Sequence, residues 1–367
     1  MYYINNNYDM KVNGKRYKTL YFEEEKLYVI NQTLLPFLFK HECLENTEDI
    51  VRAIKEMIVR GAPLIGVTGA FGVYFAFKET EEKTKEDFIY LVNKIKEARP
   101  TAVNLAFAVE SIVSKIMNIP EINHKEKILD FIFEYMEYEE NASISIGNYG
   151  VELIKEISLK KRGETVNILT HCNAGWLAAI DYGTALAPIY KANAEGINIH
   201  VWVDETRPRN QGAKLTAWEL FHENISHTVI VDNVGGHLMQ HGMVDIVIVG
   251  CDRATSNGDA ANKIGTYLKA LAAYDNGVPF YVALPISTID FDLTDGITQI
   301  NIEERSEDEV KFIEGYNSSN NLESIIITNP ESKSLNIGFD VTPARLITAF
   351  ITDNGIFKPK ELSNIKK

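Results

Sequence analysis

The chain has 367 residues, enough for two domains of ordinary size. Its formal net charge is −14 and no basic block stands out, which argues against nucleic acid as a partner, because binding it requires a basic stripe that displaces phosphate counterions. No segment approaches the roughly 20 apolar residues that span a membrane, and the N-terminus has no secretory signal. The three cysteines form no disulfide framework. We therefore expect a cytoplasmic protein without a membrane partner.

The first 145 residues are predicted to form a mostly helical domain. Two short strands are expected within residues 17–31, and apolar residues recur at three- and four-residue steps over 47–59, as in a helix. The small, apolar segment 62–76 suits a helix that packs closely against its neighbours. Further helices are predicted over 83–97, 104–117 and 124–158, the first and second of these separated by a turn at residues 99–101.

Residues 146–367 are predicted to form a Rossmann-like catalytic domain, which makes the chain an α/β protein. Short apolar strands are expected at 166–170, 197–203, 227–231, 246–249, 279–283 and 325–328. Helices are expected between them at 177–195, 213–223, 235–242, 261–276 and 307–311. This alternation is typical of a parallel sheet covered on both faces. Ligands of such sheets bind beyond the carboxyl ends of the strands.

Cys172 is the first candidate for chemistry. It lies in the segment THCNAG, directly after a predicted strand. The N-terminus of a following helix would favour its thiolate. The alternative is a buried cysteine that only fills space, with His171 as a structural neighbour.

Asp252 is the second candidate, because it follows the predicted strand that ends at Val249. A carboxylate there could transfer a proton to or from a sugar. The alternatives are a salt bridge to Arg253 or a helix cap. The adjacent Cys251 is expected to belong to the core.

Five further side chains could bind an anion. Asn262 and Lys263 are expected in the first turn of a helix, where backbone amides and the ammonium group would converge. Arg60 and Arg99 each precede a turn and a helix, so their guanidinium groups could hold one phosphate. A surface position is the alternative for each of these charged side chains. Gln211, which follows another strand, could donate to a phosphate oxygen.

The motifs form an ordered series that resembles the methylthioribose-1-phosphate isomerase family. They include RGAPLIG, RPTAVNL, THCNAG, GCDR and NGDAANKIGTY, and the resemblance extends from about residue 30 to residue 357. The family is similar in fold to the regulatory subunits of the guanine-nucleotide exchange factor for translation initiation. The resemblance implies a homodimer that acts on a small phosphorylated sugar, without a metal or any other cofactor.

The resemblance also implies roles for individual residues. Cys172 and Asp252 match the catalytic pair. The substrate-binding positions are Arg60, Gly61, Ala62, Arg99, Gln211, Asn262 and Lys263. The implied reaction of methionine salvage isomerises S-methyl-5-thioribose 1-phosphate to S-methyl-5-thioribulose 1-phosphate. We expect Asp252 to assist ring opening as a general acid, and Cys172 to serve the transfer of hydrogen from C2 to C1.

The sequence also allows other substrates and other classes of protein. Trp176, Leu64 and Cys251 depart from the family pattern, and a large indole near the site could reshape the pocket for the 5-substituent. An isomerase of 5-deoxyribose 1-phosphate is therefore an alternative. A regulatory subunit that only binds a sugar phosphate would lack the Cys/Asp pair. A nicotinamide-dependent dehydrogenase would carry Gly-x-Gly-x-x-Gly after its first sheet strand, which residues 170–175 do not provide.

Overall fold

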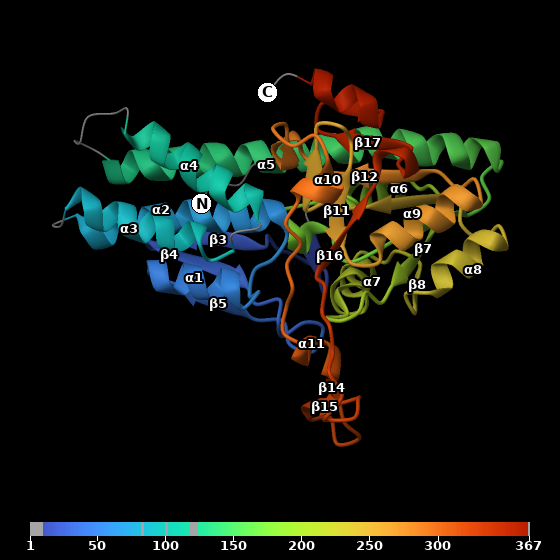
Figure 1. Cartoon of the computed structure of the whole chain (residues 1–367), viewed down its shortest axis with the longest axis horizontal. Helices are drawn as coiled ribbons and strands as arrows, with labels where there is room; N and C mark the ends of the chain where they lie inside the picture. Colours follow the sequence, from blue (N-terminus) through green and yellow to red (C-terminus); the bar gives the residue numbers. More distant parts are fainter. Residues whose placement is uncertain (1–9, 82–83, 100–101, 118–123, 366–367) are drawn as a thin grey trace.

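The computed structural model describes residues 10–81, 84–99, 102–117 and 124–365. A helical N-terminal half lies beside a half built around a parallel sheet (Figure 1). The predicted turn at residues 100–101 lies outside the described residues. Within the described ranges, no helix combines the length and the apolar character needed to cross a membrane.

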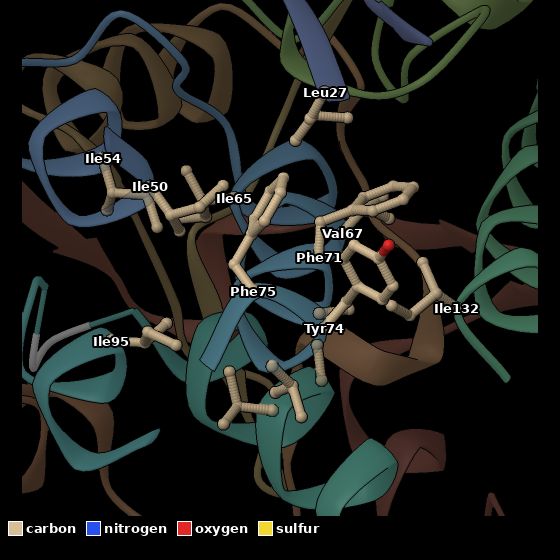
Figure 2. Packing of buried hydrophobic residues seen from close by; sticks show 14 of the residues in the cluster. Leu27, Ile50, Ile54, Ile65, Val67, Phe71, Tyr74, Phe75, Ile95 and Ile132 are labelled. Carbon is tan, nitrogen blue, oxygen red and sulfur yellow. The ribbon is translucent and has the colours of Figure 1, made fainter. Parts of the chain in front are cut away.

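The N-terminal half contains all the helices that its apolar pattern predicts. They are α1 (Thr47–Lys55), α2 (Ala62–Thr80), α3 (Lys85–Lys96), α4 (Val103–Met117) and α5 (His124–Lys160). Helix α2 is apolar around its whole circumference, as expected of a helix buried on all sides, and Val67, Phe71 and Phe75 are fully buried. Figure 2 shows these side chains among isoleucines of the surrounding helices.

Three antiparallel strands cover one side of this helical core. They are β3 (Leu20–Glu23), β4 (Lys26–Ile30) and β5 (His41–Leu44), and the sequence did not predict the third. The two-residue strands β1 (Lys11–Val12) and β2 (Lys15–Arg16) form a small hairpin before them.

The second half is built on a seven-stranded sheet with the order β18-β17-β12-β9-β6-β7-β8, parallel except for the edge strand β18. Its strands are β6 (Val166–Thr170), β7 (Ile199–Asp204), β8 (His227–Ile230), β9 (Ile246–Val249), β12 (Phe280–Ala283), β17 (Ala349–Thr352) and β18 (Gly355–Phe357). Successive residues of β9 belong to different apolar clusters, with Ile246 in one and Val247 in the other. Both faces of the central sheet are therefore buried, which explains its continuous apolar runs.

The helices of this half are α6 (Ala187–Ala194), α7 (Ala217–His222), α8 (Val234–Gln240), α9 (Thr266–Asp275), α10 (Gly296–Gln299) and α11 (Asp308–Lys311). The π-helical turn η2 (Gly212–Thr216) leads into α7. Short 3-10 helices are η1 (Trp176–Ala178), η3 (Ile286–Thr288), η4 (Ala344–Leu346) and η5 (Pro359–Asn364).

The prediction that residues 325–328 form a strand of the parallel sheet is wrong. Strand β15 (Leu322–Ile326) instead pairs antiparallel with β14 (Phe312–Tyr316), and this hairpin projects from the body of the protein (Figure 1). The place beside β12 is taken by β17, which the sequence did not predict.

Two predicted helices also differ from the structure. The helix predicted over 177–195 is confirmed only in its second half, because the chain turns at Gly183 (φ +82°), where a side chain would overlap the backbone of Gly175. The helix predicted over 261–276 begins at Thr266. Asn262 and Lys263 lie before it on strand β11 (Ala260–Lys263), so their predicted place in a first helical turn is wrong.

Strand β11 belongs to a second, four-stranded sheet with the order β13-β10-β11-β16. Its other strands are β10 (Arg253–Thr255), β13 (Ile289–Asp290) and β16 (Phe339–Thr342). Its strands β10 and β11 follow β9 directly in the chain, and β11 carries Asn262 and Lys263 to the same cavity as Asp252.

Helix α5 passes without interruption through residue 145, where the two domains were predicted to meet. Its early residue Ile132 belongs to the core of the helical half, whereas Ile146 and Ile154 belong to the core around the sheet. The domain division stays a prediction, and α5 is a rigid link between the two cores.

Candidate functional site

A cavity of about 50 Å³ lies where the start of α2, the ends of β6 and β9, and strand β11 meet. All nine residues predicted for the site line it: Arg60, Gly61, Ala62, Arg99, Cys172, Gln211, Asp252, Asn262 and Lys263. They come from positions as far apart as residues 60 and 263, so the fold brings together what the sequence separates. Their roles stay predictions.

The loop after β6 holds Cys172 in a left-handed conformation with φ +65°, which is uncommon for a residue other than glycine. Its N–H donates to Thr206 Oγ1 at 2.8 Å, and its carbonyl accepts from Thr216 Oγ1 at 2.7 Å. Its Sγ donates to Gln211 Oε1 at 3.4 Å. Backbone and thiol are thus both oriented by neighbouring side chains.

The thiol of Cys172 has a raised pKa. Burial is the main cause, and the positive charges of Arg60 and Lys263 oppose it. The expected helix N-terminus is not there, because the loop leads into the three-residue η1 rather than an α-helix. Cys172 is therefore a protonated thiol at neutral pH.

Asp252 follows β9 and is partly exposed to the cavity. The predicted alternative of a salt bridge to Arg253 is wrong, because the guanidinium of Arg253 lies 3.4 Å from Asp290 Oδ2. The backbone N–H of Asp252 donates to the carbonyl of Ala261 at 2.9 Å, which fixes the residue against β11. Cys251 is half-buried and also lines the cavity, so it is not confined to the core.

Arg60 reaches across from the helical half and is anchored on the loop of Cys172. Its guanidinium donates to Oδ1 of Asn173 at 2.5 Å and to the backbone carbonyl of the same residue at 2.6 Å. Burial lowers the pKa of Arg60, and this effect is opposed by the negative charge that a Cys172 thiolate would carry and by that of Asp252. Arg60 is therefore not the solvated surface arginine of the alternative interpretation.

Lys263 and Arg99 approach the cavity beside the ring of Phe339. Lys263 Nζ lies 4.3 Å from the ring centroid and donates to the carbonyl of Gly338 at 2.9 Å. Arg99 lies 5.8 Å from the same centroid and 3.5 Å from Glu303. Burial lowers the pKa of Lys263. Two cations here and Arg60 opposite make a site suited to a dianion.

Glu219 was not predicted, yet it supports the site from behind. This buried carboxylate on α7 accepts from Asn173 Nδ2 at 2.8 Å, from the backbone N–H groups of Trp176 and Leu177 at 3.1 Å, and from the hydroxyl of Tyr190. Burial raises its pKa to about 7. The signal in the sequence is an acid placed between the apolar Trp218 and Leu220.

Trp176 does not shape the pocket, so that interpretation is wrong. Its indole is fully buried, packs 6.1 Å from the ring of Trp218, and lines neither this cavity nor the neighbouring one. The neighbouring cavity has a volume of about 280 Å³ and shares Met57, Arg60 and Gln211 with the first.

One group of side chains near the cavity has ligand atoms close enough to hold a metal. His171, Asp204 and Asp232 have these atoms within 4.8 Å of one another. However, the ammonium of Lys269 already lies 3.3 Å from Asp204 Oδ2, and both carboxylate oxygens of Asp232 accept backbone N–H groups. These residues therefore form a structural network around a lysine.

Comparison with known proteins gives consistent results. The initiation factor 2 subunit family matches residues 58–359. The methylthioribose-1-phosphate isomerase of Sulfurimonas denitrificans is 54% identical, with 93% of this chain and 95% of the relative covered. That of Rhizobium meliloti is 50% identical, with 95% and 96% covered.

Two solved structures are also similar. The crystal structure of 5-methylthioribose 1-phosphate isomerase from Pyrococcus horikoshii OT3 has a TM-score of 0.80 and 36% identity, with 95% of this chain and 94% of that chain covered. The delta subunit of translation initiation factor eIF-2B from A. fulgidus has a TM-score of 0.77 and 34% identity, with 94% and 96% covered.

Proposed function

Because this chain belongs to the methylthioribose-1-phosphate isomerase family, we propose that it converts S-methyl-5-thioribose 1-phosphate to S-methyl-5-thioribulose 1-phosphate in methionine salvage. The chain is an isomerase that interconverts an aldose and a ketose. One observation carries the assignment of its chemistry: Cys172 and Asp252 line one cavity together with three cationic side chains.

Each part of the cavity has a task in this reaction. Arg60, Arg99 and Lys263 hold the phosphate, and Asp252 gives a proton to the ring oxygen as its bond to C1 breaks. Hydrogen moves from C2 to C1, and as the ketone forms the C2 hydroxyl returns a proton to the carboxylate of Asp252, so substrate and product contain the same atoms and the acid is restored. Cys172 serves this second stage, and burial raises the pKa of its thiol.

The neighbouring cavity supports a thioether as the 5-substituent. It shares Met57 and Gln211 with the lining of the first cavity, and beside its charged side chains it has the apolar Leu215, Phe312 and Ile313. A methylthio group would bury more apolar surface here than the methyl group of a 5-deoxy sugar, which favours the methylthio substrate.

The catalytic assignment is tested with Cys172→Ser and Asp252→Asn. We expect kcat to fall about 10²- to 10⁴-fold in each, because each removes a positioned acid–base group. Cys251→Ala is the matched control, since Cys251 lines the same cavity, and its kcat should stay within a few-fold of the wild-type value. Near-normal turnover of either variant would refute the pair.

A second measurement separates two routes for the hydrogen. Turnover in deuterated water, followed by NMR of the product, should place deuterium at C1 if Cys172 and Asp252 move the hydrogen as a proton. Product without deuterium at C1 would exclude a base whose proton exchanges with solvent during turnover, as expected of a direct hydride shift with Asp252 as the acid for ring opening.

A further inference from the structure

His171 is a buried titratable side chain that the proposed chemistry does not use. It stands at the end of β6, directly before Cys172, and is 1% exposed. Its Nδ1 lies 2.8 Å from Asp204 Oδ2, and its Nε2 lies 2.8 Å from the carbonyl oxygen of Ile264. The ring thus connects the ends of two strands of the large sheet with the turn that follows Lys263.

The partners of His171 determine what its nitrogens do. The carbonyl of Ile264 can only accept, so Nε2 carries a hydrogen and donates it. On the other side, Nδ1 lies against Asp204 Oδ2, which also lies 3.3 Å from the ammonium of Lys269. The orientation of the ring is fixed by two bonds to separate elements.

The turn between β11 and α9 is pressed against this ring. Gly265 has φ +103°, and a Cβ added there would come within 3.0 Å of His171 Cε1. On the opposite side, the carboxylate of Asp340 accepts the N–H groups of Gly265 and Tyr267 at 2.7 and 3.0 Å. The turn is therefore located between an imidazole and a carboxylate, with Lys263 at its beginning.

We propose that His171 is a positioning residue, whose bond to the Ile264 carbonyl sets the place of Lys263 relative to Cys172. This inference rests on the proposed role of Lys263 in holding the substrate phosphate. His171 does not need to touch the substrate. It fixes the distance between Lys263 and Cys172, which both line the cavity. Its loss should weaken anion binding more than it slows the chemical steps.

Two substitutions separate the two bonds of the ring. The amide nitrogen of glutamine lies close to the place of Nε2, so His171→Gln keeps a donor for Ile264 and loses the bond to Asp204. The shorter His171→Asn places its amide near Nδ1, keeps Asp204 and loses Ile264. Both variants lack the imidazole, so they are matched controls for each other.

The experiment measures KM and kcat for S-methyl-5-thioribose 1-phosphate, and separately the Kd of sulfate by calorimetry on the full chain. Sulfate is a tetrahedral dianion that does not titrate near neutral pH. We expect His171→Asn to raise KM and the sulfate Kd about tenfold, as the loss of a buried hydrogen bond allows, with kcat less affected. His171→Gln should stay within about threefold of the wild type in both constants.

A purely structural role predicts the reverse order, because the charged bond to Asp204 is the stronger of the two. Equal constants for both variants, or a larger defect in His171→Gln, would overturn the proposal. If neither variant folds, Gly265→Ala tests the same turn with His171 intact and should also raise the sulfate Kd, whereas an unchanged Kd would contradict the inference. Wild-type protein that binds sulfate but turns over no sugar phosphate would refute the proposed function and leave this test valid.

Discussion

Buried cations and a buried thiol set the electrostatics of the cavity. Burial lowers the pKa of Arg60 and Lys263 and raises that of Cys172. The two positive charges oppose the shift at Cys172, and a thiolate at Cys172 would oppose the shifts at the two cations. Among the described residues, the cavity lining carries three cationic side chains and one carboxylate, that of Asp252. A dianionic substrate would neutralise the excess positive charge of these buried side chains, whose burial otherwise costs free energy.

The raised pKa of Cys172 predicts how the thiol reacts with iodoacetamide. Alkylation should be slow at pH 7 and accelerate through pH 9 and above, because only the thiolate reacts. Lys263→Met removes a charge that lowers this pKa, so the acceleration should move to higher pH. The rate is followed by mass spectrometry of the Cys172 peptide, and the alkylation rate of the partly exposed Cys43 is the reference. A rate for Cys172 that is already constant from pH 7 would contradict the prediction.

The candidate residues could be predicted because strand ends and motifs mark them. Cys172 and Asp252 each follow an apolar strand, and parallel strands end at one edge of a sheet. Glu219 and the full role of Asn173 could not be predicted in this way. Their importance comes from burial and from hydrogen bonds to segments about 40 residues or more away, such as the bond from Arg60 to Asn173.

At the level of elements, amphipathic and wholly apolar segments were predictable, whereas short strands were not. Strand β11 consists of Ala260–Lys263 and has no alternation of apolar and polar residues. It is a strand because it pairs with β16, more than 70 residues later in the chain. The projecting hairpin shows the opposite error, since an apolar run at residues 325–328 indicated a buried strand and the segment is exposed.

The start of α2 depends on a glycine. Gly61 has φ +92°, and a side chain there would overlap the backbone of Ala178. We expect Gly61→Ala to lower the free energy of unfolding by more than about 1 kcal/mol, the cost of the conformation alone, and to raise KM by displacing Arg60. Urea unfolding and steady-state kinetics measure the two effects.

Gly163→Ala is the matched control for that change, because Gly163 has φ +84° and open space around the added Cβ. It should show only the conformational cost and an unchanged KM. Equal losses of unfolding free energy in the two variants would show that the overlap with Ala178 adds nothing to the conformational cost.

Helix α5 contacts the cavity-lining segment η3 through Glu139, whose carboxylate accepts from Ser287 Oγ at 3.3 Å. Burial raises the pKa of Glu139 from 4.5 to about 7, so the folded protein keeps a proton that the unfolded chain has lost. Its contribution to stability therefore falls as the pH rises from 4.5 to 7, and the penalty is complete above pH 7.

Glu139→Gln should remove this part of the pH dependence. Between pH 5 and pH 8, the wild type should lose up to about 3 kcal/mol of unfolding free energy relative to the variant. Urea unfolding at several pH values measures the difference. Glu25→Gln is the control, because the hydrogen bond from Lys125 lowers the pKa of Glu25 to about 2, outside this range. Parallel curves for wild type and Glu139→Gln would contradict the expectation.

For the whole molecule, the α/β class and the order of its two halves follow from the sequence, because the apolar pattern changes at about residue 165 from helical spacing to short runs. The family resemblance also predicts a homodimer. Light scattering after gel filtration should then give about twice the chain mass of 41.4 kDa at micromolar concentration. A mass equal to one chain at all concentrations would contradict the dimer.

Phosphorus NMR of the purified protein tests the proposed reaction without any variant. S-methyl-5-thioribose 1-phosphate and 5-deoxyribose 1-phosphate are offered side by side, and the conversion of each to its ketose 1-phosphate is followed. We expect both signals to change, with the higher kcat/KM for the methylthio sugar. A higher kcat/KM for the deoxy sugar would contradict the proposed substrate, and turnover of neither would contradict the proposed reaction.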